Sequence, residues 1–67
     1  MAKYFTLHAV HNGHESFVEI VNSVKSGISK MPEYPDWKTC DYMRVRDCLG
    51  GLRAEYCRDT NRTRLTR

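Results

Sequence analysis

The sequence contains no long run of apolar residues. A membrane-spanning helix needs about 18 or more of them in succession, so the sequence excludes such a helix. The opening stretch MAKYFTLHAV also lacks the apolar segment and the small-residue cleavage pattern of a secretory signal peptide. We therefore expect an intracellular, cytoplasmic protein that makes no contact with a membrane.

Cysteines are few and poorly placed for disulfides. The three of them, Cys40, Cys48 and Cys57, are an odd number at wide spacings, which is a poor disulfide framework. This pattern favours free thiols in a reducing compartment, where cysteines often act as small buried apolar side chains.

The motifs of enzyme active sites are missing as well. Gly50-Gly51 lacks the surrounding pattern and the Lys-Ser or Lys-Thr pair of a phosphate-binding loop. The sequence has no zinc-protease, kinase or paired-carboxylate signature, and a chain of 67 residues has little interior for a catalytic pocket. The sequence therefore predicts a protein that is not an enzyme and binds no cofactor.

Residues 3–10, KYFTLHAV, are rich in aromatic and β-branched side chains and predict a strand, which the NG pair at 12–13 ends in a tight turn. On a strand, His8 and His11 point to opposite faces because the side-chain period is two, and His14 lies beyond the turn. This arrangement favours a strand that turns into the following helix over a metal site. The alternative is a zinc site made by His11, His14 and a cysteine from elsewhere.

The next segment has the periodicity of an amphipathic helix. Apolar residues recur at helical spacing from Phe17 to Met31, and Ser16 and Glu19 match a capping box, so we predict a helix here. Pro32 ends it. The apolar face of this helix is expected to pack against the core of the domain.

Two structures fit the stretch MRVRDCLGGLRAEYC. Its apolar residues are consistent with a second helix, but pairing across the glycines at 50–51 gives a hairpin, with Val45 opposite Tyr56 and Arg46 opposite Glu55. We favour the hairpin because adjacent glycines would cost a helix about 2 kcal/mol. The first strand also needs partners for its backbone groups.

The predicted fold is therefore α+β: a small single domain of β-α-β-β order, with one amphipathic helix on a three-stranded sheet. The compact domain covers residues 1–58, and residues 59–67 form a basic, flexible tail. The alternative β-α-α arrangement would need a second copy to complete its sheet and so predicts a homodimer, whereas the hairpin form allows a monomer.

The charge of the chain is uneven. Residues 1–57 carry seven cationic and seven acidic side chains, whereas residues 58–67 carry four arginines and one aspartate, which accounts for the net charge of +3. Every lysine precedes Thr39 and every arginine follows it. Because arginine can hold a carboxylate or a phosphate through two hydrogen bonds, the arginines are the candidate binding residues.

We expect a small accessory or regulatory protein that binds another protein stoichiometrically, as a phage-type inhibitor or modulator of a larger host machine. Its arginines would dock on an acidic surface of that partner. The alternative is nucleic-acid binding through the same side chains. The candidate binding residues are Tyr42, Arg44, Arg46, Arg53, Arg58, Arg62, Arg64 and Arg67.

Overall fold

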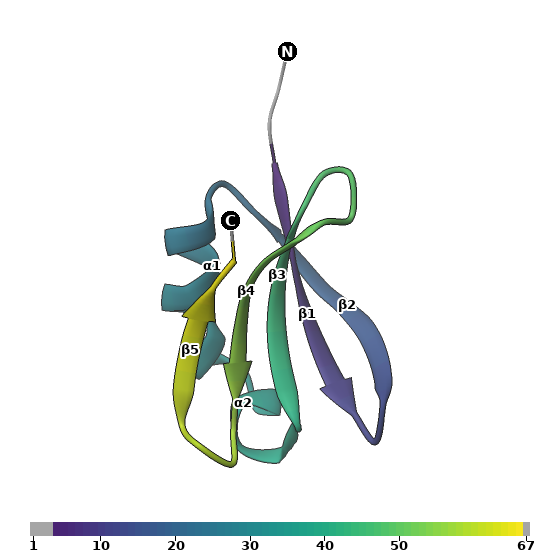
Figure 1. Cartoon of the computed structure of the whole chain (residues 1–67), viewed down its shortest axis with the longest axis vertical. Helices are drawn as coiled ribbons and strands as arrows, with labels where there is room; N and C mark the ends of the chain where they lie inside the picture. The colour runs from purple at the N-terminus through teal and green to yellow at the C-terminus, as the bar shows by residue number, and fades with distance from the viewer. Residues whose placement is uncertain (1–3, 67) are drawn as a thin grey trace.

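A β-hairpin, a helical segment and a three-stranded meander follow one another along the chain (Figure 1). The computed structural model describes residues 4–66. In chain order the elements are β1 (Phe5–His11), β2 (His14–Val21), α1 (Val24–Lys30), the 3₁₀ turn η1 (Met31–Glu33), α2 (Asp36–Thr39), β3 (Tyr42–Asp47), β4 (Leu52–Cys57) and β5 (Arg62–Leu65).

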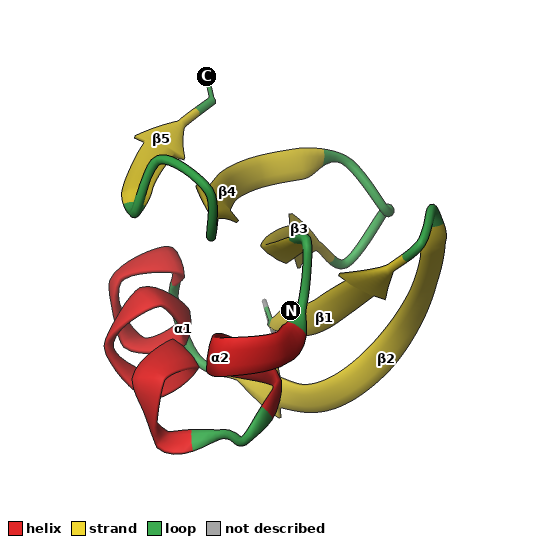
Figure 2. Ribbon diagram, turned by 90° about the horizontal axis from the view of Figure 1, so that it is seen from below, coloured by secondary structure: helices red, strands yellow, loops and turns green. Residues whose placement is uncertain are grey.

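All five strands belong to one antiparallel sheet in the order β2-β1-β3-β4-β5. The helical segment connects β2 to β3, so β3 lies beside β1 and the two ends of the sheet are β2 and β5. The sheet curls, and α1 lies across its open side (Figure 2). The inner face of the sheet is thereby covered by the helices, and the outer face is left without a covering layer.

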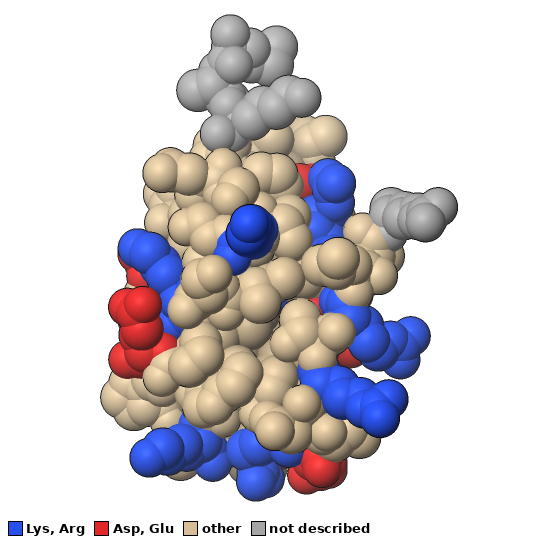
Figure 3. Space-filling model, turned by 90° about the vertical axis from the view of Figure 1, so that its left-hand side faces the viewer, with Lys and Arg blue, Asp and Glu red and all other residues tan. Residues whose placement is uncertain are grey.

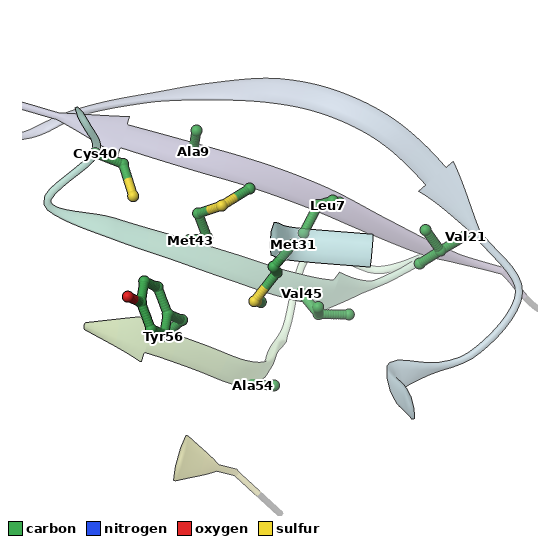
Figure 4. Packing of buried hydrophobic residues seen from close by; sticks show 9 residues of the cluster. All are labelled: Leu7, Ala9, Val21, Met31, Cys40, Met43, Val45, Ala54 and Tyr56. Atoms are coloured by element: carbon green, nitrogen blue, oxygen red, sulfur yellow. The ribbon is translucent and has the colours of Figure 1, made fainter. Parts of the chain in front are cut away.

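The core lies between the inner face and the helical segment (Figure 4). Alternate residues of β1, β3 and β4 point inward, as the two-residue period of a strand requires. Trp37 of α2 closes the core by stacking on Tyr56, with ring centroids 3.7 Å apart. The buried cluster consists of Leu7, Ala9, Val21, Met31, Cys40, Met43, Val45, Ala54 and Tyr56.

Residues 14–21 form strand β2, so the predicted helix over residues 16–31 is wrong in its first half. The predicted turn before it is confirmed: Asn12 and Gly13 both adopt positive φ, at 53° and 78°. A turn of this kind brings the chain straight back along β1, where its backbone groups complete a sheet ladder. Sheet pairing therefore overrides the helical periodicity.

The helix begins seven residues, or about two turns, later than the capping box suggested. Its N-cap is Ser23, whose hydroxyl oxygen accepts a hydrogen bond from the Ser26 N–H at 3.0 Å. Ser16 instead donates to the Ala9 carbonyl on the neighbouring strand. The predicted end of the helix is close to the observed one, because α1 ends at Lys30 and the following turn contains the proline.

β3 and β4 form the predicted hairpin, so the alternative of a second helix is wrong. The register differs from the predicted one: Glu55 opposes Arg44 and not Arg46, and Val45 opposes Ala54. The hairpin also contains a bulge, because the pairing jumps by one residue between Val45 and Arg46.

The hairpin loop is longer than the predicted two-residue turn. Asp47 organises it: one carboxylate oxygen accepts hydrogen bonds from the N–H groups of Leu49 and Gly51, and its carbonyl accepts one from Gly50. An aspartate at the first position of a turn commonly caps the loop in this way. The loop therefore spans residues 48–51.

Residues 62–65, within the expected tail, form β5 and pair with β4. The observed domain is mostly sheet with short helices, which agrees with α+β at the coarse level, but it has five strands where three were predicted. The flexibility of residues 59–67 stays a prediction. Among residues 4–66, neither the length nor the apolarity of any helix suffices for crossing a membrane.

We expect Gly27→Ala to destabilise the fold by about 2 kcal/mol. Gly27 is buried in α1, and an added Cβ would lie 2.8 Å from a methyl group of Val45 and 3.2 Å from one of Val21. Both valines are buried, and their branched side chains have few alternative rotamers. The crowding thus outweighs the gain in helix propensity of about 1 kcal/mol.

Urea unfolding followed by tryptophan fluorescence measures this change. Ser29→Ala on the exposed side of the same helix is the matched control and should shift stability by less than about 0.5 kcal/mol. An unchanged or raised midpoint for the Gly27 variant would show that the helix can move away from the sheet at no cost.

Candidate protein-binding surface

The outer face of the sheet carries most of the predicted binding residues together with two unpredicted apolar ones. Directly paired residues of adjacent strands point to the same side of a sheet, so the strand register determines which residues make up the outer face. The outer face includes Thr6, His8, Val10, Glu15, Phe17, Ile20, Tyr42, Arg44, Arg46, Glu55, Cys57, Arg62 and Arg64.

An ion-pair network centred on Glu15 occupies the middle of this face. Its carboxylate accepts hydrogen bonds from Arg44 Nη1 at 2.8 Å, from Arg46 Nη2 at 2.9 Å and from Arg46 Nε at 2.6 Å. Arg44 Nε also donates to Glu55, at 2.8 Å. The network links β2, β3 and β4 across β1. The charges of Arg44 and Arg46 are therefore compensated within the fold.

These contacts fix the protonation states of the network. Hydrogen bonds from the Arg46 guanidinium, assisted by Arg44, lower the pKa of Glu15 from 4.5 to about 2, although partial burial opposes the shift. Partial burial also lowers the pKa of His8 below 6.5, against the attraction of the nearby Glu15 carboxylate. At neutral pH Glu15 is charged and His8 is neutral, so the pair is unsuited to exchanging a proton.

Tyr42 and Arg53 lie on opposite faces. Tyr42 is on the outer face, with the Arg44 guanidinium 5.5 Å from its ring centroid. Arg53 is the extra residue of the bulge in β4, and its guanidinium lies 5.8 Å from the Phe5 ring centroid and 3.9 Å from Asp47. The three hairpin arginines, which on a regular hairpin would be expected to share one face, are therefore divided between the two faces.

The remaining candidates lie at and beyond the end of β4. Arg58 Nε donates to the Cys40 carbonyl at 2.7 Å, so part of its guanidinium is used within the fold. Arg62 and Arg64 are exposed on β5, and neither forms an ion pair with a carboxylate in the described part of the chain. Arg67 lies outside the described residues.

A hollow separates α1 from β5. Its larger part, about 640 Å³, is lined by Val24, Arg53, Leu65 and Thr66. An adjoining part of about 400 Å³ is almost entirely apolar and is bordered by Ile28. Figure 3 shows this side of the molecule, where cationic side chains flank a band of uncharged ones. The hollow is open to solvent, and its apolar walls are available for contact.

Besides Tyr4, four large apolar side chains are exposed, and sequence reasoning did not predict Phe17, Ile20 or Leu49 as surface residues. Phe17 and Ile20 are 57% and 60% exposed, Leu49 at the hairpin loop is 91% exposed, and Leu65 beside the hollow is 71% exposed. The first two were assigned to the inward face of a helix. Leu49 had a usable signal, because a leucine beside two glycines is typical of a loop tip.

The histidines and cysteines form no metal site in the part of the chain that the structure describes, where no three potential ligands cluster. His8 shares a hydrogen bond with the Thr6 hydroxyl, and His11 lies 3.5 Å from Asp36. All three cysteines are free thiols, of which Cys40 is buried and Cys48 exposed. Burial raises the pKa of the Cys40 thiol, which makes it a poor nucleophile.

Comparison with known proteins finds no match to any family, to any curated protein or to any solved structure. The site is therefore interpreted from its own geometry.

Proposed function

We propose that this chain is a small, non-catalytic, intracellular protein that binds an acidic surface of another protein stoichiometrically and so inhibits or modulates a larger machine. The observation that carries the proposal is the pair Arg62 and Arg64, which lie exposed on β5 without a carboxylate partner among the described residues.

The two arginines of β5 differ from the two of β3, and this difference supports β5 as the binding surface. Arg44 and Arg46 lie in the middle of the sheet and are already bound to Glu15 and Glu55, so a partner would gain little from them. Arg62 and Arg64 are on the edge strand, and their guanidinium groups form no ion pair with a carboxylate of residues 4–66. A guanidinium offers two parallel N–H groups to a carboxylate, which gives geometric specificity as well as attraction.

The surroundings favour a protein partner over a nucleic acid. Glu55 stands directly opposite Arg64 and Arg44, so acidic groups interrupt the path that a phosphate backbone would follow across the outer face. Leu65, 71% exposed, adjoins the apolar hollow. Apolar surface beside charged groups is the usual composition of a protein–protein interface.

Charge reversal at β5 tests the proposal. The tagged chain is used to capture its partner from cells that carry the gene, and the purified partner is then titrated against variants by biolayer interferometry. Arg64→Glu is expected to weaken binding about tenfold, and the effect should shrink as salt is raised. Lys38→Glu makes the same change of charge at another exposed position and should change the Kd less than twofold.

Equal affinities for the two variants would contradict the proposal. A gel-shift assay with random-sequence duplex DNA and single-stranded RNA at two salt concentrations checks the alternative function. Tight, salt-sensitive retention that is lost in Arg64→Glu would establish nucleic-acid binding in place of protein binding.

A further inference from the structure

The curled sheet is open between β5 and α1. β5 is the last strand of the sheet, and among residues 4–66 it pairs only with β4, so no described strand lies beside its second edge. That edge turns toward α1, and the hollow lined by Val24, Ile28 and Leu65 lies between them (Figure 2). The gap is therefore bounded by a free strand edge on one side and by a helix with apolar side chains on the other.

The backbone groups at this free edge can be identified. The Thr66 N–H donates to the Arg53 carbonyl on β4, at 2.8 Å. In an antiparallel sheet the N–H and C=O of successive residues point to alternate edges. The backbone groups of Thr63 and Leu65 consequently point away from β4, toward the gap, and are available to another strand.

The side chains of β5 also alternate. Arg62 and Arg64 lie on the outer face, opposite Cys57 and Glu55 of β4. Thr63 and Leu65 fall on the inner side, and Leu65 lines the hollow. A strand added beside β5 would place alternate side chains next to the two arginines and the intervening ones over the apolar walls.

We propose that β5 pairs with an extended segment of the partner protein in which acidic and apolar residues alternate. The acidic side chains contact Arg62 and Arg64, and the apolar ones enter the hollow beside Val24, Ile28 and Leu65. Addition of a peptide strand to a sheet edge is a common form of recognition, in which the backbone gives affinity and the side chains give specificity. This inference rests on the proposed function, since it specifies the acidic partner.

The charges on β5 favour this partner segment over two other occupants, a second copy of the chain and a nucleic acid. A second copy pairing through its own β5 would bring Arg62 and Arg64 beside the same residues of that copy, and like charges at cross-strand positions repel. A nucleic acid would satisfy the arginines on the outer face but would leave the apolar hollow on the inner side unfilled. An alternating acidic and apolar strand satisfies both sides of β5 at once.

Two peptides of the same composition and charge provide the test: GEVEVEG, which alternates, and GEEEVVG, which does not. Each is titrated into the ¹⁵N-labelled chain and followed by NMR. The alternating peptide is expected to shift the amide signals of residues 62–66 and 24–29 and to bind at least about fivefold more tightly than the block peptide. The amide protons of Thr63 and Leu65 should exchange more slowly with solvent when it is bound, because they become hydrogen bonded.

Two variants test the two sides of the strand. Arg62→Glu combined with Arg64→Glu should abolish binding of both peptides. Leu65→Ala should lower the affinity for the alternating peptide about threefold to fivefold and leave the affinity for the block peptide unchanged. Leu49→Ala removes the same atoms from an exposed loop at a different place and should change neither affinity.

The outcomes distinguish strand addition at β5 from binding of an acidic surface without strand addition. If the two peptides bind equally and the double arginine variant loses this binding, strand addition is wrong and the proposed binding of an acidic surface still holds. No binding of either peptide, protection of amides outside β5, or concentration-dependent self-association through Thr63 and Leu65 also overturns it. Stronger shifts of the same amides with oligothymidine than with the alternating peptide would overturn both proposals.

Discussion

Leu7→Ala is expected to lower the free energy of unfolding by about 3 kcal/mol. Leu7 is fully buried in β1, a strand that is paired on both sides, and it belongs to the nine-residue cluster (Figure 4). Truncation removes its apolar contacts and leaves a cavity that the surrounding strands can only partly fill. Domains of this size have a total stability of only about 3–10 kcal/mol, so the loss is a large share of it.

The single tryptophan provides the measurement. Trp37 stacks on the buried ring of Tyr56, so its fluorescence reports the integrity of the core during urea unfolding. Leu49→Ala is the matched control, because it makes the same chemical change at a side chain that is 91% exposed, and it should alter stability by less than about 0.5 kcal/mol. Similar midpoints for the two leucine variants would show that the described core does not hold the fold.

Glu15→Gln is expected to destabilise the chain by about 2 kcal/mol at pH 7. The variant keeps the shape of the side chain but removes the charge that compensates Arg44 and Arg46. Arg44 retains its contact with Glu55, and Arg46 retains the Gly50 carbonyl, so the network is weakened and not abolished. The cost arises because three charge-assisted hydrogen bonds lose their common acceptor charge.

The same residue predicts how stability depends on pH. The pKa of Glu15 falls from 4.5 in the unfolded chain to about 2 in the folded one, so the folded state favours the charged carboxylate. Its stabilisation is complete above pH 4.5 and is lost as the pH falls toward about 2. Glu15→Gln should therefore show a shallower loss of stability across this range than the wild-type chain.

Unfolding midpoints at a series of pH values test this prediction. Glu33→Gln, at an exposed position of η1, is the matched control and should reproduce the wild-type profile. A Glu15 variant whose profile parallels the wild type down to pH 2.5 would mean that the network does not hold this carboxylate charged.

Local chemistry explains which parts of the fold were predictable. The Asn12-Gly13 turn followed from residues that readily adopt positive φ, and the β3–β4 hairpin followed from glycines that a helix disfavours. The register of that hairpin was not predictable. It depends on a bulge in the pairing and on the hydrogen bonds that Asp47 makes to its loop.

Residues 17–21 show why the rest was missed. Their spacing fits a helix, but β1 offers a complete set of backbone partners directly after the turn, and strand pairing satisfies more groups than an isolated helix would. The strand then turns Phe17 and Ile20 outward. The same dependence on distant partners applies to the arginines, since only their neighbours decide which charges are compensated.

The sequence by itself determined an α+β chain with a tight first turn, a second hairpin and an excess of arginine near its C-terminal end, because these depend on residue type and local conformation. The tertiary structure decided that Arg44 and Arg46 are bound to Glu15 while Arg62 and Arg64 remain available. Glu15 lies some 30 positions from both of its arginines, at separations of 29 and 31 residues, and only the order of the strands brings them together.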